Sequence, residues 1–322
     1  MKARSTQAIV AAALAIGTCC WTNTTVAAVA TEQPRIRLAF VTCCVNQKFF
    51  DPLKRGMRDA AQMLDVDCDF LGTEEVDIPA QVKLFRQALA AGYDGIAVNL
   101  IDPQAFDEVV AAAVARGVPV VGFNVDDNAT PNARLASVNQ QLYEAGRSLA
   151  RHALPDIPQG AHILLTKHDD GVSALEDRQR GIRDELEQKR VTYTMVVTGN
   201  DAARGADVVA AALQADPDIQ IVLCSGQSDT EAAGRAIEKH FAGQGRWAAG
   251  FDLSPKTLQL VRDGHIRFTI DQQPYVQGFY PVVALTLKLR YGIAPSNIDA
   301  GAAIVDRANV EQIQELTGKG FR

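Results

Sequence analysis

The chain has 322 residues, which suggests about two domains at the usual domain size. With 47% hydrophobic and 22% charged residues, it has the composition of a globular protein that can build full cores. A net charge of −6 argues against binding to nucleic acid or to an anionic membrane surface.

The first thirty residues differ from the rest of the chain. Lys2 and Arg4 make a basic start, an apolar run follows from Ala8 to Ile16, and Ala28-Val29-Ala30 has the small-residue pattern of a cleavage site. The apolar run is shorter than the ~20 residues that a membrane anchor needs. Residues 1–30 are therefore predicted to be a signal peptide for export, and its removal takes the net charge from −6 to −8.

Four cysteines remain after this segment: Cys43, Cys44, Cys68 and Cys224. Their spacing matches no zinc site and no CxxC motif, so no metal or cofactor is expected. The adjacent pair Cys43-Cys44 is either two free, half-buried thiols or a vicinal disulfide, which ordinary disulfide geometry does not easily allow.

Strands and helices alternate along the first half of the mature chain. Short apolar runs predict buried strands, and longer amphipathic stretches closed by glycine predict helices. The expected strands are 35–42, 67–71, 95–98, 118–123 and 134–138, and the expected helices are 52–64, 78–91 and 103–116.

The same alternation restarts in the second half. The expected strands are 161–166, 192–197, 219–224, 247–251, 266–270 and 302–305, and the expected helices are 140–153, 172–189, 203–215, 230–241 and 255–263, with a short helix from 309. Residues 277–291 are expected to return to the first domain. A strict strand–helix alternation predicts an α/β fold with two doubly wound parallel-sheet domains.

Polar side chains follow two consecutive strands near the end of the second half. Asp252 comes directly after the strand 247–251, and Gln272 lies just past the strand 266–270. Ligands of open α/β sheets bind at the carboxyl ends of the strands. A carboxylate and an amide there suit a neutral polyhydroxy ligand. Alternatively, Asp252 only caps the helix that begins at Ser254-Pro255, and Gln272 is an ordinary loop amide.

The stretch FDLSPKTLQLVRDGHIRFTIDQQPYVQG, residues 251–278, resembles the C-terminal signature of periplasmic sugar-binding proteins of the ribose-binding type. The resemblance extends over nearly the whole mature chain. It implies a type I periplasmic binding fold with a hinge of several crossings, near Val138, Asp271 and Ser296–Ala300. The implied lobes are 31–138 with 271–299, and 139–270 with 300–322.

In the first lobe the resemblance points to residues after each strand. Phe49 and Phe50, in NQKFFDPLKRGM, match paired aromatics that stack on the sugar ring; otherwise they cover the following helix. Asn99 matches a ligand-contacting asparagine. Asn124-Val125 stands where the family usually has Asp-Arg, which argues against ribose as the ligand. Asp126 or Asp127 either replaces the missing carboxylate or is a solvated turn residue.

In the second lobe and at the crossings the family's ligand contacts match further positions. Arg178 corresponds to an arginine that donates to sugar hydroxyls, unless it is a solvated helix residue. The remaining positions are Asp252, Gln272 and Ser137, which is otherwise a plain strand serine. Ser228-Asp229 stands where the family commonly has an Asn-Asp pair. Asp229 is also a candidate N-cap of the following helix.

The expected function is to bind a neutral sugar or polyol in the periplasm, as a monomer, and to deliver it to the membrane permease of an ABC-type importer. The alternatives are a sensor that presents its ligand to a chemoreceptor or histidine kinase, and an exported glycoside hydrolase using Asp252 with Asp229 or Asp169. The chain has no G-x-S-x-G, H-E-x-x-H or P-loop motif. The strand-end histidines, His162 and His168, have no evident partner in the sequence. The protein is therefore expected not to be an enzyme.

Overall fold

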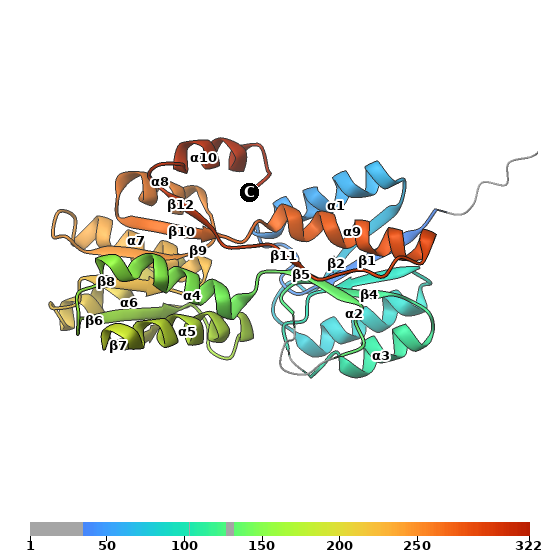
Figure 1. Ribbon diagram of the computed structural model, residues 1–322, viewed down its shortest axis with the longest axis horizontal. Helices are drawn as coiled ribbons and strands as arrows, with labels where there is room; N and C mark the ends of the chain where they lie inside the picture. Colours follow the sequence, from blue (N-terminus) through green and yellow to red (C-terminus); the bar gives the residue numbers. More distant parts are fainter. Residues whose placement is uncertain (1–34, 103, 127–131) are drawn as a thin grey trace, which may run out of the picture. The chain divides into compact units, whose positions relative to one another are not determined.

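A computed structural model describes residues 35–102, 104–126 and 132–322. The predicted signal peptide, Asp127 and Pro103 lie outside these residues. Two six-stranded sheets carry the fold, and Figure 1 shows their strands and the helices that cover them.

The first sheet has the strand order β11-β5-β4-β3-β1-β2, and all its neighbouring strands are parallel. Both of its faces are buried: Leu38 and Phe40 of β1 pack in one apolar cluster, and Ala39 and Val41 pack in another. Burial on both faces explains why these strands read as continuous apolar runs. The strands are β1 (Arg37–Thr42), β2 (Asp67–Gly72), β3 (Gly95–Val98), β4 (Val120–Asn124), β5 (Ala136–Asn139) and β11 (Ile298–Asp299).

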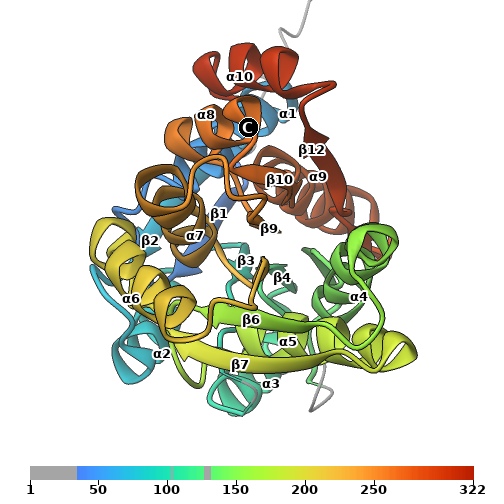
Figure 2. The same ribbon diagram turned by 90° about the vertical axis from the view of Figure 1, so that its left-hand side faces the viewer.

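The second sheet has the order β12-β10-β9-β8-β6-β7 and is parallel except for the pair β10–β12, which is antiparallel. Figure 2 shows β6 and β7 side by side at one edge of this sheet. The strands are β6 (His162–Lys167), β7 (Thr192–Val197), β8 (Ile221–Cys224), β9 (Trp247–Phe251), β10 (Ile266–Asp271) and β12 (Ala303–Asp306).

Helices complete two units, which we call the first and second lobes. The first lobe holds the first sheet with α1 (Phe50–Leu64), α2 (Ile78–Ala90), α3 (Asp107–Ala115) and α9 (Pro274–Tyr291). The second lobe holds the second sheet with α4 (Leu142–Ala153), α5 (Ser173–Leu186), α6 (Ala202–Ala215), α7 (Gln227–His240), α8 (Pro255–Asp263) and α10 (Val310–Gly318); the short 3-10 turns Leu154–Asp156 and Glu187–Lys189 follow α4 and α5. The predicted fold class is confirmed.

Within the described residues the chain passes between the two sheets three times. It crosses from β5 to α4, from β10 to α9 and from β11 to β12. The two-residue strand β11, which sequence reasoning took as a plain crossing, pairs with the end of β5. These close-set crossings are the multi-crossing hinge that the family resemblance implied.

The residues predicted to begin and end the helix α8 do so in the structure. Ser254 is its N-cap and accepts a hydrogen bond from the backbone N–H of Thr257, Pro255 is its first residue, and Gly264 ends it with φ of 87°. The alternative in which Asp252 caps this helix is therefore wrong.

Among the helices expected from the sequence, α3 and α7 start furthest from their expected positions. Helix α3 begins at Asp107 rather than 103, because the Asp102 carboxylate accepts from the N–H groups of Gln104 and Ala105 and forms a turn before the helix. Helix α7 begins at Gln227, with Gly226 as its N-cap. Asp229 is thus inside the first turn of α7 and is not its cap.

Each lobe contains one pair of helices that meet through glycines. In the first lobe, a Cβ added to Gly56 of α1 would overlap the carbonyl oxygen of Tyr275, and one added to Gly278 of α9 would overlap that of Leu53. In the second lobe, Gly146 of α4 lies in the same way against the carbonyl oxygen of Arg178. The contact of α4 with α5 therefore fixes the backbone that carries Arg178.

No helix in the described part of the chain is long and apolar enough to cross a membrane.

Candidate functional site

Polar residues from both lobes meet at the carboxyl ends of the strands. Asn124 ends β4 and Asp252 follows β9, one in each lobe. Both have left-handed backbone conformations, with φ of 64° and 70°. Asn and Asp tolerate this conformation better than other non-glycine residues.

In the first lobe, Asn99 and Asn124 are linked to each other. The Asn99 amide Nδ2 donates to Thr42 Oγ1 at 3.0 Å and to Asn124 Oδ1 at 3.4 Å. Asn99 Oδ1 accepts from the backbone N–H of Val125 at 3.2 Å. These bonds hold the strand-end amides in fixed orientations.

Gln272 connects the two lobes. Its Oε1 accepts from Asn124 Nδ2 at 3.4 Å, and its Nε2 donates to Asp252 Oδ1 at 2.6 Å. Gln277, the fourth residue of α9, accepts from Asn124 Nδ2 at 2.9 Å and donates to the Gln272 carbonyl at 2.7 Å. A continuous chain of side chains thus runs from Asn99 to Asp252.

Arg178 extends this chain into the second lobe. Its Nη1 lies 3.7 Å from Asp252 Oδ2, its Nε and Nη2 both donate to Gln140 Oε1, and its guanidinium carbon lies 4.1 Å from the Phe251 ring centre. Its exposed fraction is only 3%, so the alternative of a solvated helix arginine is wrong. Arg180 is exposed, as expected from its different helical angle.

The buried charges affect each other's protonation. Burial raises the pKa of Asp252, and the nearby Arg178 guanidinium opposes that rise. Burial likewise lowers the pKa of Arg178, and Asp252 and Asp229 oppose the change. The pairing of Arg178 with Asp252 thus favours the charged form of each side chain, against the larger effect of burial, and charged groups form the stronger hydrogen bonds to hydroxyls.

Asp229 is held by three neighbours and joins the network only indirectly. Its Oδ2 accepts from Thr166 Oγ1 at 2.9 Å and from the Ser225 N–H at 2.8 Å, and its Oδ1 lies 3.1 Å from His168 Nδ1. The expectation that His168 lacks a partner is therefore wrong. Gly226, where a Cβ would meet the imidazole, leaves room for the His168 ring.

The placement expected for His162 is wrong, because it is the first residue of β6 and lies at the amino end of that strand. It and the remaining carboxylate of the hydrolase alternative also have partners. His162 contacts the hydroxyls of Thr192 and Thr194, so it too has partners that the sequence did not reveal. Asp169 accepts from Asn200 Nδ2 at 3.2 Å.

The two serines do not join the network in the described part of the chain. Ser137 lies in β5 and donates to Asn139 Oδ1 at 3.2 Å. Ser228 lies half-buried in the first turn of α7. Asp126, considered as a replacement for the missing carboxylate, instead pairs with Arg134.

The paired phenylalanines have different surroundings. Phe50, 4% exposed, is the first residue of α1 and packs against Phe70 in the core, so it covers the helix as the alternative reading proposed. Phe49 is half-buried, contacts Phe50 edge-on, and lines a cavity.

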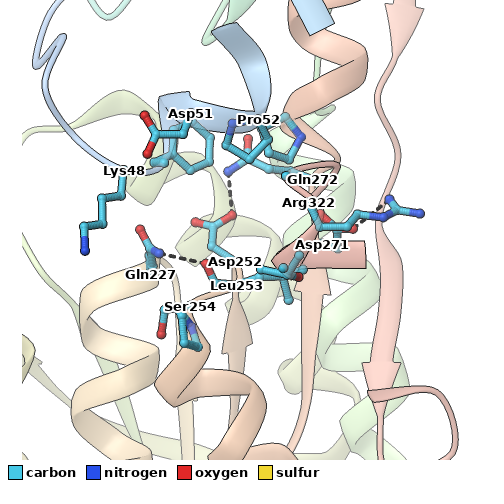
Figure 3. Close-up of a pocket in the computed structure, with 16 residues that line it drawn as sticks. Lys48, Asp51, Pro52, Gln227, Asp252, Leu253, Ser254, Asp271, Gln272 and Arg322 are labelled. Carbon is cyan, nitrogen blue, oxygen red and sulfur yellow. Dashed lines mark hydrogen bonds and ion pairs between the residues drawn. The ribbon is translucent and has the colours of Figure 1, made fainter. Parts of the chain in front are cut away.

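This cavity has a volume of about 350 Å³ and borders the network (Figure 3). Asp252 and Gln272 form one side of it, and the dashed line between them in Figure 3 is their hydrogen bond. Its lining comes from both lobes, including the end of α10 and the residues after it: Lys48, Phe49, Asp51, Pro52, Gln227, Asp252, Leu253, Ser254, Pro255, Asp271, Gln272, Pro274, Thr317, Gly318, Gly320 and Arg322.

Cys43 and Cys44 are free, buried thiols beside this region. Cys44 has a left-handed backbone, with φ of 53°. A hydrogen bond from the Cys43 thiol lowers the pKa of Cys44 to about 7.

Sequence reasoning missed Gln140 and Gln277. Gln140 comes directly after β5 and binds Arg178, and Gln277 was read only as part of the chain's return to the first lobe. The strand-end rule that selected the other residues would have found Gln140, whereas Gln277 becomes visible only once α9 is placed.

A pH-dependent effect is expected at Asp271, beside the cavity. Burial raises its pKa above the model-peptide value of 3.8, with Arg322 opposing. The folded state then binds more protons than the unfolded state in the window above 3.8, so this group's contribution to stability falls as pH rises through the raised pKa. Urea unfolding from pH 3.5 to 7 should show a steeper fall for the wild type than for Asp271→Asn, by at most about 1.4 kcal/mol per pH unit. If the free energy of unfolding changes with pH in the same way for the wild type and Asp271→Asn, this prediction is wrong.

This geometry, two doubly wound lobes with strand-end polar side chains meeting across a three-crossing hinge, is that of a type I periplasmic binding protein. The family model for the periplasmic binding protein domain matches residues 38–292, and the chain belongs to this family.

Known relatives cover most of the chain. It is 30% identical over 295 residues to the xylose/arabinose-binding protein XylF of Sulfolobus acidocaldarius, covering 87% of this chain and 73% of that one. It is 26% identical over 234 residues to the ribose import binding protein RbsB of Bacillus subtilis, covering 73% and 75%. A carbohydrate transporter structure from Acidothermus cellulolyticus, solved with myo-inositol, is 28% identical with a TM-score of 0.77, covering 90% and 100%.

Proposed function

We propose that this protein binds a neutral sugar or polyol between its two lobes and delivers it to the permease of an ABC-type importer. The observation that carries the proposal is the side-chain network from Asn99 to Arg178, which draws on both sheets and borders the cavity. A ligand with several hydroxyls can exchange hydrogen bonds with each member of such a network.

The balance of charge supports a neutral ligand. Within the network the Arg178 cation already faces the Asp252 anion, so a neutral hydroxyl can bridge them while a charged group would leave one charge uncompensated. Half-buried Phe49 offers an apolar face for the C–H side of a sugar ring. The relatives named for xylose, arabinose and ribose, and the neighbour solved with myo-inositol, bind ligands of this class.

The choice among these ligands follows from Asn124. An amide here, followed by Val125, lacks the carboxylate–guanidinium pair expected for ribose. We therefore propose a pentose other than ribose, a cyclitol or a deoxygenated sugar. The site residues are those predicted from the sequence, with Phe49, Asn99, Asn124, Arg178, Asp252 and Gln272 making the main contacts and Phe50, Ser137, Ser228 and Asp229 supporting them.

The same proposal includes the protein's location in the cell and the bounds of the two lobes that move. Residues 1–30 would direct export to the periplasm and be removed near Ala30. The lobes that close on the ligand would comprise 31–138 with 271–299, and 139–270 with 300–322, except that Asp271, the last residue of β10, moves with the second lobe. The protein would act as a monomer and bind without chemistry, since Asp229, one member of the suggested carboxylate pair, is already occupied by three neighbours.

A thermal-shift screen across pentoses, hexoses, inositols and alditols tests this function. A true ligand at 100 times its Kd should stabilise the folded protein by about 2.7 kcal/mol, which corresponds to roughly 5–10 °C in Tm. Small-angle scattering should show the protein more compact with that ligand. A sugar phosphate serves as the control and should give no shift. If no neutral polyhydroxy compound raises Tm, or if one is turned over, the proposal is wrong.

A further inference from the structure

The segment that follows α10 turns back toward the cavity. Gly320, with φ of 75°, ends the helix in a Schellman arrangement: its N–H donates to the Thr317 carbonyl at 2.9 Å, and the Phe321 N–H donates to the Leu316 carbonyl at 3.0 Å. This turn fixes the direction in which Phe321 and Arg322 leave the helix. We call residues Thr317–Arg322, the last two residues of α10 and the four that follow it, the clasp segment.

Both ends of the clasp segment are attached to the second lobe. Before it, α10 packs against α8 and β12, as Figure 1 shows for the dark red helix. After the turn, Arg322 Nη1 lies 2.8 Å from Asp271 Oδ2, and this carboxylate at the end of β10 is only 2% exposed (Figure 3). The segment between these attachments is therefore held by the second lobe in one conformation.

The middle of the clasp segment contacts the first lobe. The Arg55 guanidinium of α1 lies 4.1 Å from the Phe321 ring centre, and the same side chain donates to the Lys319 carbonyl. The Tyr275 ring of α9 lies 5.4 Å from that of Phe321. Asp59 fixes both partners, because it accepts from the Tyr275 hydroxyl at 2.9 Å and lies 3.6 Å from Arg55.

The clasp segment also borders the cavity. Thr317, Gly318, Gly320 and Arg322 form part of its lining, together with Asp252 and Gln272 of the network. Separating the lobes would break the contacts of Phe321 with Arg55 and Tyr275 while leaving the attachments to the second lobe in place. These contacts thus exist only when the lobes are together.

We propose that the clasp segment is a wall of the ligand cavity and a device that favours the closed arrangement of the lobes. Phe321 binds a preformed site on the first lobe made by Arg55 and Tyr275, and its release is required for opening. The part of this inference that concerns the ligand rests on the proposed sugar-binding function. The part that concerns closure does not.

The experiment measures lobe separation without any ligand. Small-angle scattering of the wild type, Phe321→Ala and Arg55→Ala should give a larger radius of gyration for both variants. Arg58→Ala is the matched control, because Arg58 is an exposed arginine on the same helix; it should behave as the wild type. Both single variants remove the contact between Arg55 and Phe321, and each removes one further contact, that of Phe321 with Tyr275 or that of Arg55 with the Lys319 carbonyl. The double variant should therefore be at least as extended as either single one.

If the ligand-free variants scatter as the wild type does, the inference is wrong. Circular dichroism verifies that each variant is folded, and Arg55→Ala decides the outcome if Phe321→Ala fails to fold. For a ligand found in the thermal-shift screen, both variants should bind roughly two- to thirty-fold more weakly, the range of a cation–π contact, through faster release. If no sugar binds but the ligand-free variants are still more extended, the proposed function is wrong. The inference that the clasp segment favours the closed arrangement of the lobes is then still supported.

Discussion

Replacing Arg178 with alanine should weaken ligand binding by about 1.5–3 kcal/mol, which is roughly 10- to 100-fold in Kd, because charged hydrogen bonds of this strength are lost. The change should also lower the free energy of unfolding. Gln140 Oε1 and the Ser225 carbonyl would lose their buried donor, and Asp252 would lose its nearest cation. An unsatisfied buried group costs about 1–3 kcal/mol.

The matched control is Arg180→Ala on the same helix. Arg180 is exposed and pairs with Asp177 at 2.9 Å, so its removal should leave affinity and stability nearly unchanged. Isothermal titration calorimetry and urea unfolding measure the two effects separately. An Arg178→Ala protein with wild-type affinity would remove Arg178 from the site, whatever happens to its stability.

Replacing Gly278 with alanine should destabilise the first lobe by about 1–3 kcal/mol, the cost of overpacking a close contact. The new methyl group would overlap the Leu53 carbonyl and press on the backbone of Met57, and neither can move without shifting α1. The better helix propensity of alanine, about 1 kcal/mol, offsets only part of this cost.

Gly318→Ala is the control for this prediction. Gly318 is also helical and has nothing within 4 Å of the added Cβ, so alanine there should be neutral or stabilise by about 0.4–1 kcal/mol. Urea unfolding of the two variants beside the wild type provides the comparison. Equal stability of Gly278→Ala and Gly318→Ala would show that α1 and α9 are not held as closely as described.

The fold followed from local signals. Ser254, Pro255 and Gly264 mark the ends of α8 by chemistry that acts within a few residues, and apolar runs such as that of β9 are read directly. The start of α7 was misjudged because Asp229 is a good N-cap residue. In the structure its carboxylate instead accepts from the nearby Ser225 N–H and from Thr166, which is distant in sequence, and Asp229 lies inside the helix.

The candidate site followed from one geometric rule, that parallel strands end at the same edge. This rule selected Asp252 and Gln272, and the family resemblance added Asn99 and Asn124 at the ends of two further strands. The structure joins all four in one network. The rule has no bearing on Gln277 or on Phe321, whose neighbours are distant in sequence and depend on how α9 and α10 pack. It also did not separate Phe49 from Phe50, since the burial of adjacent residues depends on the direction of α1.

The left-handed backbone at Asn124 and Asp252 limits how this protein's ligand preference can change. With φ near +65°, β-branched residues at either position would be strained, and glycine, asparagine and aspartate fit this backbone best. Under the proposed function, ligand selectivity would change most readily by exchanging an amide for a carboxylate at Asn124 or Asp252. Relatives that bind a different sugar are therefore expected to differ from this chain at one or both of these positions.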